Sequence, residues 1–326
     1  MSNISLRSIK YNARWNDFTG PFFTIITPLY NRRTTIERTL KSVEAQTYRS
    51  LEYIIIDDGS TESSDDIIEA YMKKSKLPIC YVKKNNGGVH TARNIGYQLA
   101  RGLLVVCIDS DDELTINACE LFHKSWLSIP EACRNSYWQI KGLCVDEVGN
   151  LCSARFPENI NTMSAENARQ FFSIANGEQL GCRVVSILKN NLFPEPQGVK
   201  FVNENIIWLP MENEYLSWGL NEVVRVYHTE GDDRLSGIKK KKNIQACINA
   251  LWNSAYELNH PEFFITNSKK FILTMIRFCI MRNILMNEVP DVVVKYNING
   301  IKNQIGKSLL WVPSLFGSLL YRKYRM

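Results

Sequence analysis

The sequence predicts an α/β fold with a mainly parallel sheet, followed by a helical extension at the C-terminal end. In the first half of the chain, short apolar runs alternate with segments of helical periodicity, which is the pattern of βαβ units. Each apolar run ends in polar residues, as expected where the carboxyl ends of parallel strands share one edge of a sheet. After residue 232 the chain becomes strongly basic and two long helical segments follow.

Three strand-to-helix units are expected in the first hundred residues. Their strands are predicted at 22–27, 51–56 and 79–82. Their helices are predicted from a cap at Thr34 or Thr35 to about Gln46, from about Ser63 to before Pro78, and at about 89–101. The loop at 83–88 contains two glycines, which free its backbone to approach a ligand closely.

The apolar run at 103–108 predicts a central strand that is covered on both faces. It ends in Asp109, Ser110, Asp111 and Asp112. In extended geometry Asp109 and Asp111 project from the same side, so the pair can hold a divalent cation. Because magnesium and manganese prefer six ligands, phosphate oxygens and water would complete the site, which points to a metal-bound diphosphate. The alternative is a solvated acidic turn in which Asp112 caps the next helix.

Beyond the acidic segment the expected elements are less regular. Helices are predicted at 116–127 and 161–176, strands at 137–145 and 223–228, an apolar segment of either type at 183–188, and helices at 243–258 and 266–287. The predicted organisation is a lead-in over 1–20, an α/β domain over 21–232, and a basic helical extension over 233–326.

The charge is unevenly distributed. Residues 233–326 hold 15 Lys and Arg against 5 Asp and Glu, a net +10, and the remaining 24 against 28 give residues 1–232 a net −4. A basic surface suits nucleic acid, anionic lipid or a phosphorylated acceptor. The stretch at 305–326 combines Trp and Leu with basic residues, which predicts either an interfacial membrane anchor or a tail helix packed on the domain.

The start of the chain has no apolar core of the kind found in secretory signals, and no segment reaches the roughly 18 consecutive apolar residues of a membrane span. The sequence therefore predicts a cytoplasmic protein.

Four motifs, in this order, resemble those of family 2 glycosyltransferases with the GT-A fold. They are Ile26-Thr27-Pro28-Leu29-Tyr30-Asn31, Ile55-Ile56-Asp57-Asp58-Gly59-Ser60, Asn86-Gly87-Gly88 with Ala92-Arg93-Asn94-Ile95-Gly96, and Ile108-Asp109-Ser110-Asp111-Asp112. The resemblance covers about residues 20–230. It implies a Rossmann-like, mainly parallel sheet that binds a nucleotide sugar, and an enzyme that inverts the anomeric configuration.

The resemblance also implies a set of site residues. The nucleotide sugar would contact Thr27, Pro28, Tyr30, Arg32, Asp57, Asp58, Asn86, Gly87, Arg93, Asp109 and Ser110. Stacking by Tyr30 and hydrogen bonds to Asp57 suit a uracil ring, and Arg93 suits a phosphate. Asp109 and Asp111 would hold Mn²⁺ or Mg²⁺, with His228 as a third ligand.

Structural roles remain open for several of these residues. Tyr30 is alternatively a packing aromatic, Arg93 the partner of a nearby acid, Asp58-Gly59-Ser60 a plain turn, and His228 a structural histidine. His90, near the glycine loop, either touches a phosphate or has no ligand role.

Glu204 is the candidate general base. In the family a Glu-Asp pair lies at about this distance after the metal motif, here 204 − 109 = 95 residues. This chain has Glu204-Asn205, and because asparagine cannot accept the proton, Glu204 inherits the role. Glu212 and Glu214 are rivals, and a structural Glu204 is the other interpretation.

The expected activity is metal-dependent transfer of a sugar from a UDP-sugar to a hydroxyl of a lipid-diphosphate-linked saccharide, as in O-antigen or capsule synthesis. The protein would act peripherally at the inner face of the plasma membrane. The alternative is a nucleotidyltransferase that acts on a sugar phosphate. It is disfavoured because the segment after the first strand is not a glycine-rich, basic phosphate-binding loop. A non-enzymatic basic module for membranes or polyanions ranks last, since no nucleic-acid motif is present. The donor sugar, acceptor and oligomeric state cannot be read from the sequence.

Overall fold

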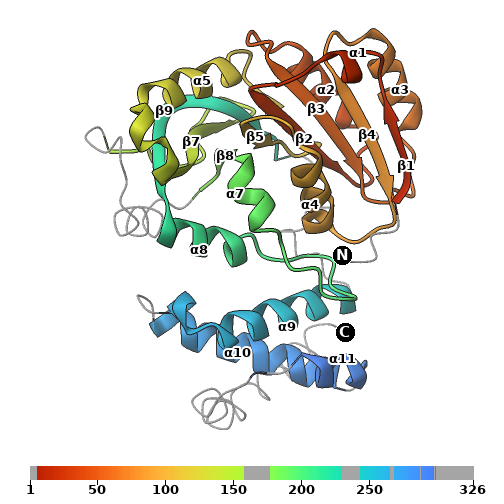
Figure 1. Cartoon of the computed structure of the whole chain (residues 1–326). Coiled ribbons are helices and arrows are strands. Elements are labelled where there is room, and N and C mark those ends of the chain that lie inside the picture. The colour runs from red at the N-terminus through yellow and green to blue at the C-terminus, as the bar shows by residue number, and fades with distance from the viewer. Residues whose placement is uncertain are drawn as a thin grey trace. The chain divides into compact units, whose positions relative to one another are not determined.

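The structure, a computed structural model, describes residues 6–157, 177–229, 243–264, 268–286, 288–296 and 298. The chain divides into two compact units, one formed by residues 1–193 and 207–230 and the other by residues 194–206 and 231–326 (Figure 1). The expected helix at 161–176 and the tail at 305–326 lie outside the described residues.

The first half of the first unit contains the predicted strand-to-helix alternation. Its elements are β1 (Leu6–Tyr11), α1 (Arg14–Asp17), β2 (Phe23–Leu29), α2 (Ile36–Glu44), β3 (Leu51–Asp57), α3 (Asp65–Lys74), β4 (Ile79–Lys84), α4 (Val89–Leu99) and β5 (Leu104–Cys107). The strands predicted at 22–27, 51–56, 79–82 and 103–108 are confirmed as β2 to β5. β1 was not predicted, and it brings part of the lead-in over 1–20 into the sheet.

The second half of the first unit is less regular. Its elements are β6 (Glu113–Leu114), α5 (Ala118–Ser128), the 3₁₀ helix η1 (Glu131–Ser136), β7 (Tyr137–Asp146), β8 (Gln179–Val184), α7 (Val185–Asn190), α8 (Asn205–Glu214) and β9 (Leu216–Tyr227). The ambiguous segment at 183–188 is the junction of β8 and α7. The last strand begins at Leu216, earlier than the predicted residue 223.

Within the described residues these strands form one nine-stranded sheet in the order β1-β4-β3-β2-β5-β8-β7-β9-β6. The central run β4-β3-β2-β5 is parallel, and β1 and β8 pair antiparallel with its two outer strands. A parallel sheet of this kind needs both faces covered, which explains why β2 and β3 are buried at every position.

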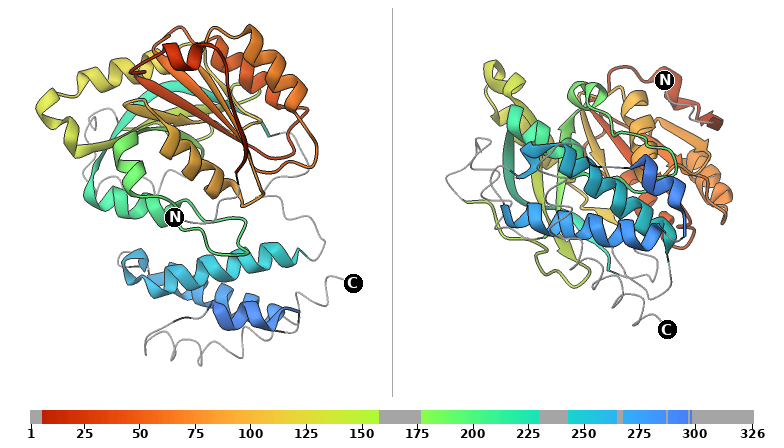
Figure 2. Two further views of the ribbon diagram at one scale, coloured as in Figure 1. Left: turned by 45° about the vertical axis from the view of Figure 1, so that its right-hand side comes forward. Right: turned by 90° about the horizontal axis from the view of Figure 1, so that it is seen from below.

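Helices cover both faces of this sheet. The helices α2, α3 and α5 contribute Ile36, Ile68 and Phe122 to one continuous core with the strands. On the other face α4 packs against β2 and β3 and beside α7, an arrangement that can be followed in Figures 1 and 2. A Cβ atom at Gly96 of α4 would lie 2.7 Å from the side chain of Ile26, so glycine sets the close approach of this helix to the sheet.

The second unit consists of the loop segment at 194–204, the first residues of α8 and, after residue 243, mainly helices where it is described. It contains α9 (Ile244–Asn259), the 3₁₀ helix η2 (Pro261–Phe264), α10 (Ser268–Leu285) and α11 (Pro290–Lys295). The helices predicted at 243–258 and 266–287 are confirmed as α9 and α10. Among the described helices, none is both long and apolar enough to cross a bilayer.

Candidate functional site

Four loops leave the sheet at one edge because the registers of the parallel strands align their carboxyl ends. Leu29 at the end of β2 lies opposite Asp57 at the end of β3, and Asp57 lies opposite Lys83 of β4. Cys107, the last residue of β5, pairs with Ile26 of β2. The polar segments that follow these strands, at 30–33, 58–60, 85–88 and 109–112, therefore start at the same edge.

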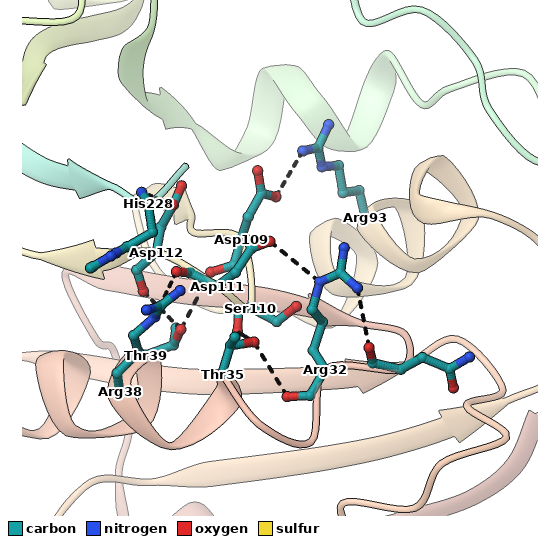
Figure 3. Close-up of polar contacts among 11 residues, drawn as sticks. Arg32, Thr35, Arg38, Thr39, Arg93, Asp109, Ser110, Asp111, Asp112 and His228 are labelled. Carbon is teal, nitrogen blue, oxygen red and sulfur yellow. Dashed lines mark hydrogen bonds and ion pairs between the residues drawn. The ribbon is translucent and has the colours of Figure 1, made fainter. Parts of the chain in front are cut away.

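Helix α2 fixes the backbone of the acidic segment after β5. Thr35 donates its hydroxyl to the Ser110 carbonyl at 2.9 Å, Arg38 Nε donates to the Asp111 carbonyl at 2.8 Å, and Thr39 donates to the Asp112 carbonyl at 2.7 Å (Figure 3). Thr35 is the N-cap residue, as predicted, but its side chain does not cap the helix. Its hydroxyl instead helps to hold the acidic segment in place.

The carboxylates of Asp109 and Asp111 each face an arginine, as Figure 3 shows. Arg93 Nη2, from α4, lies 3.3 Å from Asp109 Oδ1, and Arg32 Nε, from the loop after β2, lies 3.3 Å from Asp111 Oδ2. The two aspartate side chains are 44% and 28% exposed, so a ligand from solvent can reach both. The edge thus combines reachable carboxylates with two arginines, Arg93 and Arg32, whose side chains are 11% and 24% exposed.

Asp109 and Asp111 supply carboxylate oxygens, the donor type that Mg²⁺ and Mn²⁺ prefer, so the pair suits the predicted divalent cation by donor chemistry. Within the described ranges no group of three or more His, Cys, Asp and Glu residues is arranged to hold a metal. A cation would therefore take Asp109 and Asp111 from the protein and its other oxygen ligands from a diphosphate and water, which is the usual arrangement for magnesium at phosphate sites.

Asp112 has a different environment from its neighbours. Its side chain is 1% exposed, lies 3.4 Å from Arg225 Nη1, and accepts the backbone N–H of His228 at 3.0 Å. Burial raises the pKa of Asp112 to about 7, although the Arg225 guanidinium opposes this shift. Asp112 does not cap the next helix, because α5 begins after Asn117. It is a buried contact between the acidic segment and β9.

His228, predicted as a third metal ligand, lies next to this contact. Its Nε2 is 2.7 Å from Glu113 Oε1, and the pairing of β6 with β9 holds the two residues together. Metal binding by His228 stays a prediction.

Asp57 and Asp58, at the end of β3, are both buried. Asp57 accepts the Ser60 N–H at 2.8 Å. Asp58 accepts the N–H groups of Gly87 and Gly88 at 2.8 and 2.7 Å and forms an ion pair with Lys84 Nζ. Asp58 is therefore more than part of a turn, because it shapes the glycine loop that was predicted to approach the nucleotide.

The other predicted nucleotide contacts divide into buried and reachable residues. Thr27 is fully buried and accepts a hydrogen bond from Tyr53 at 2.9 Å, and Pro28 is buried beside it in β2. Tyr30 is 44% exposed, as a stacking platform requires. Asn86 and Gly87 are partly exposed, whereas Ser110 and His90 are buried.

The three candidate bases lie on or just before α8. Glu204 immediately precedes the helix, is partly exposed and belongs to the second compact unit. Glu212 is buried and lies 3.1 Å from Lys141 Nζ, and Glu214 is exposed at the end of the helix. The ion pair with Lys141 gives Glu212 a structural function.

Sequence reasoning missed the buried partners of these acids. Lys84 and Arg225 have side chains that are 3% and 6% exposed. Lys84 is the last residue of β4, and Arg225 interrupts the apolar run at 223–227 of β9. A lysine or arginine inside an apolar run is rarely buried without a partner, so this pattern was the available signal.

Comparisons with known proteins agree with this geometry. Residues 24–133 match the family model described as glycosyl transferase family 2. The chain is 28% identical over 250 residues to an uncharacterized glycosyltransferase of Rickettsia bellii, a match that covers 74% of this chain and 34% of the relative. It is 25% identical over 220 residues to the GalNAc(5)-diNAcBac-PP-undecaprenol beta-1,3-glucosyltransferase of Campylobacter jejuni, covering 66% of this chain and 67% of that protein. The chain thus spans only about a third of the Rickettsia relative.

Among solved structures, S. aureus TarS 1-349 in complex with UDP superposes with a TM-score of 0.52 at 17% identity. The match covers 92% of this chain and 91% of the TarS chain, and it shows a shared fold. Together with the family match and the sheet edge described above, it confirms the GT-A fold and the predicted resemblance to family 2 glycosyltransferases, whose family model matches residues 24–133.

Proposed function

We propose that the protein transfers a sugar from a UDP-sugar to a hydroxyl of a lipid-diphosphate-linked saccharide, with a divalent metal at Asp109 and Asp111. The observation that carries the proposal is the paired arrangement of Asp109 with Arg93 and of Asp111 with Arg32 at the sheet edge. A diphosphate bridges such a site, because its oxygens satisfy both a metal held by the carboxylates and the guanidinium groups.

The chain's own residues would bind and orient the donor. Tyr30 would stack on the uracil and Asp57 would accept a hydrogen bond from it, while Arg32 and Arg93 would turn from the aspartates to the diphosphate oxygens. Asp58 would keep the glycine loop in its binding shape through Gly87 and Gly88. The bound metal would supply charge neutralisation for the departing diphosphate.

The reaction is a single displacement at the anomeric carbon. As the acceptor hydroxyl attacks, Glu204 takes its proton, a new glycosidic C–O bond forms, and the bond between the anomeric carbon and the diphosphate oxygen breaks to release UDP. Attack opposite the leaving group inverts the anomeric configuration. We assign the base to Glu204 over Glu212, because Glu212 is buried and paired with Lys141.

The acceptor assignment draws on chemistry and on a relative. The C-terminal third carries a net +10, from 15 basic and 5 acidic residues, which suits an acceptor with phosphate groups near an anionic membrane. The name of the Campylobacter relative describes transfer to a saccharide linked through PP to undecaprenol. We propose the same class of acceptor here, at the inner face of the plasma membrane, in surface polysaccharide synthesis of the O-antigen or capsule type.

The first test is UDP release from a panel of UDP-sugars, with Mn²⁺, with Mg²⁺ and with a chelator. We expect one donor to be hydrolysed slowly in a metal-dependent way and faster when a prenyl-diphosphate-linked saccharide is added. The absence of UDP release from every donor would contradict the proposal.

The base is tested by a matched pair of variants. Glu204→Gln should abolish transfer and Glu214→Gln, at the exposed end of α8, should leave it intact. The reverse pattern would move the base to Glu214.

A further inference from the structure

The second unit contains a pocket of about 320 Å³ that is lined mostly by polar and charged residues. Its lining comes from α9, α10 and the chain at the start of α8, and all of it belongs to that unit: Asn203, Asn205, Glu257, Lys269, Lys270, Leu273, Thr274 and Arg277. The volume lies at the lower end of the range for small-molecule sites. A pocket of this size suits a small group better than a whole nucleotide sugar.

The wall formed by residues 200–205 is fixed to α9 by asparagine side chains. Asn253 accepts the backbone N–H of Asn203 at 2.7 Å and donates to the Phe201 carbonyl at 2.9 Å. Asn249 accepts the N–H of Lys200 at 2.9 Å. Because these contacts hold the backbone, Asn203 and Asn205 stand at defined positions on one side of the pocket.

The lining carries an excess of positive charge. Lys270, Leu273, Thr274 and Arg277 follow the three- and four-residue spacing of one face of α10. The lining includes three cationic side chains and one carboxylate, Glu257. Glu257 is 5% exposed, accepts the Thr274 hydroxyl at 3.4 Å and lies 3.9 Å from Lys270 Nζ.

Glu257 therefore balances Lys270 and leaves the other two cations uncompensated. In the described part of the chain no carboxylate forms an ion pair with Lys269 or Arg277. Two cations, one of them a guanidinium fork, and two asparagine amides in a pocket of this size match the oxygens of a phosphate or diphosphate.

We propose that this pocket binds the diphosphate group of the acceptor substrate. The proposal rests on the proposed function for its biological meaning, since Asn203 and Asn205 flank Glu204, the proposed base. A diphosphate held by residues on both sides of Glu204 would bring the acceptor to the residue that removes its proton. The site would thus select acceptors that carry a diphosphate, independently of the donor site at Asp109 and Asp111.

Binding of inorganic pyrophosphate to the full chain, without divalent metal, tests the pocket directly by isothermal titration calorimetry. We expect the double variant Lys269→Gln, Arg277→Gln to bind at least about tenfold more weakly than the wild type, because two charge-assisted contacts are lost. The matched control Lys41→Gln, Lys124→Gln removes the same charge from exposed positions on α2 and α5 and should bind normally. Equal weakening in both double variants would show a general charge effect and overturn the proposal.

Competition separates the sources of the anion. Farnesyl diphosphate should displace pyrophosphate, and inorganic phosphate should do so at least about tenfold less well, since it makes fewer contacts. Equal potency of phosphate would overturn the diphosphate assignment. Vesicles containing anionic phosphatidylglycerol should not displace pyrophosphate, and displacement by them would make the pocket a lipid headgroup site.

The donor reaction distinguishes failure of this proposal from failure of the proposed function. Asp111→Ala should lose UDP-sugar hydrolysis and keep pyrophosphate binding. If the wild type hydrolyses UDP-sugar but binds pyrophosphate no better than the double variant Lys269→Gln, Arg277→Gln, the diphosphate pocket is refuted and the proposed function stands.

Discussion

Two acidic segments follow parallel strands of the same sheet, and they differ in what surrounds their carboxylates. After β3, Asp58 is buried and its oxygens are engaged by Lys84 and by two backbone N–H groups of the glycine loop. After β5, Asp109 and Asp111 are partly exposed and face arginines at 3.3 Å. Aspartates at similar places in the fold thus have different roles. Asp58 in the first segment stabilises the glycine loop, and Asp109 and Asp111 in the second are accessible to a ligand.

The largest expected effect concerns stability at the first segment. Asp58→Ala would leave Lys84 buried without its partner and remove the acceptor of the Gly87 and Gly88 N–H groups. Breaking a buried ion pair from one side costs about 3–5 kcal/mol of unfolding free energy, which urea denaturation would measure. The double variant Asp58→Ala, Lys84→Met should recover part of this lost stability. A loss below about 1 kcal/mol for Asp58→Ala would show that the segment after β3 does not have the structural role assigned to it.

The second effect concerns activity at the other segment. Asp111→Asn keeps the size of the side chain and removes a proposed metal ligand, so kcat/KM for UDP-sugar should fall at least about a hundredfold. Because Asp111 is partly exposed, the unfolding free energy of the Asp111→Asn variant should differ from that of the wild type by less than about 1 kcal/mol. Equal losses of stability in Asp111→Asn and Asp58→Ala would show that both segments are structural.

A third prediction uses Asp112, the buried member of the second segment. Its pKa is raised to about 7 in the folded protein from an ordinary value of 3.8, mainly by burial. Between these values the folded state binds a proton that the unfolded state has lost. The contribution of Asp112 to stability therefore falls as the pH rises, by about 1.4 kcal/mol per pH unit.

Asp112→Asn should remove this pH-dependent contribution to stability. Between pH 5 and pH 7 the wild type should therefore lose stability relative to the variant. Thermal unfolding across this range measures it. Parallel pH profiles for the two proteins would place the folded pKa of Asp112 near its ordinary value.

The smallest expected effect concerns the arginines that face the second segment. Arg93→Lys keeps the charge but loses the planar fork that suits a diphosphate, so KM for UDP-sugar should rise about tenfold with little change in stability. Arg33→Lys, at an exposed ion pair with Asp66, serves as the control and should leave KM unchanged. A similar KM for Arg93→Lys and wild type would exclude Arg93 from diphosphate binding.

The parallel core could be predicted from the sequence because its signals are local. The strands β2 to β5 are continuous apolar runs, and the helices between them have clear periodicity. β1 was missed because Leu6–Tyr11 is a mostly exposed edge strand with charged residues among its apolar ones. The first half of β9 was missed because Gly219, Asn221 and Glu222 interrupt its apolar pattern, and Pro210 masked the helical character of α8.

The location of the candidate site could be predicted from the sequence, but the contacts between its residues could not. The order of the motifs located the edge of the sheet and the acidic segment. No sequence pattern indicated that Asp58 would meet Lys84 or that Asp112 would meet Arg225, since 26 and 113 positions separate the partners along the chain. Only the folded chain separates the buried carboxylates from the reachable ones.

The edges of the parallel core have a consequence for folding. The family match spans residues 24–133 and so includes β2 to β5, but β1 and β8, the neighbours of its outer strands, lie outside it. A fragment cut to the family match would leave β4 and β5 each unpaired on one side, where β1 and β8 pair with them in the whole chain. Open strand edges pair with other chains. We therefore expect the isolated segment that carries the family match to self-associate.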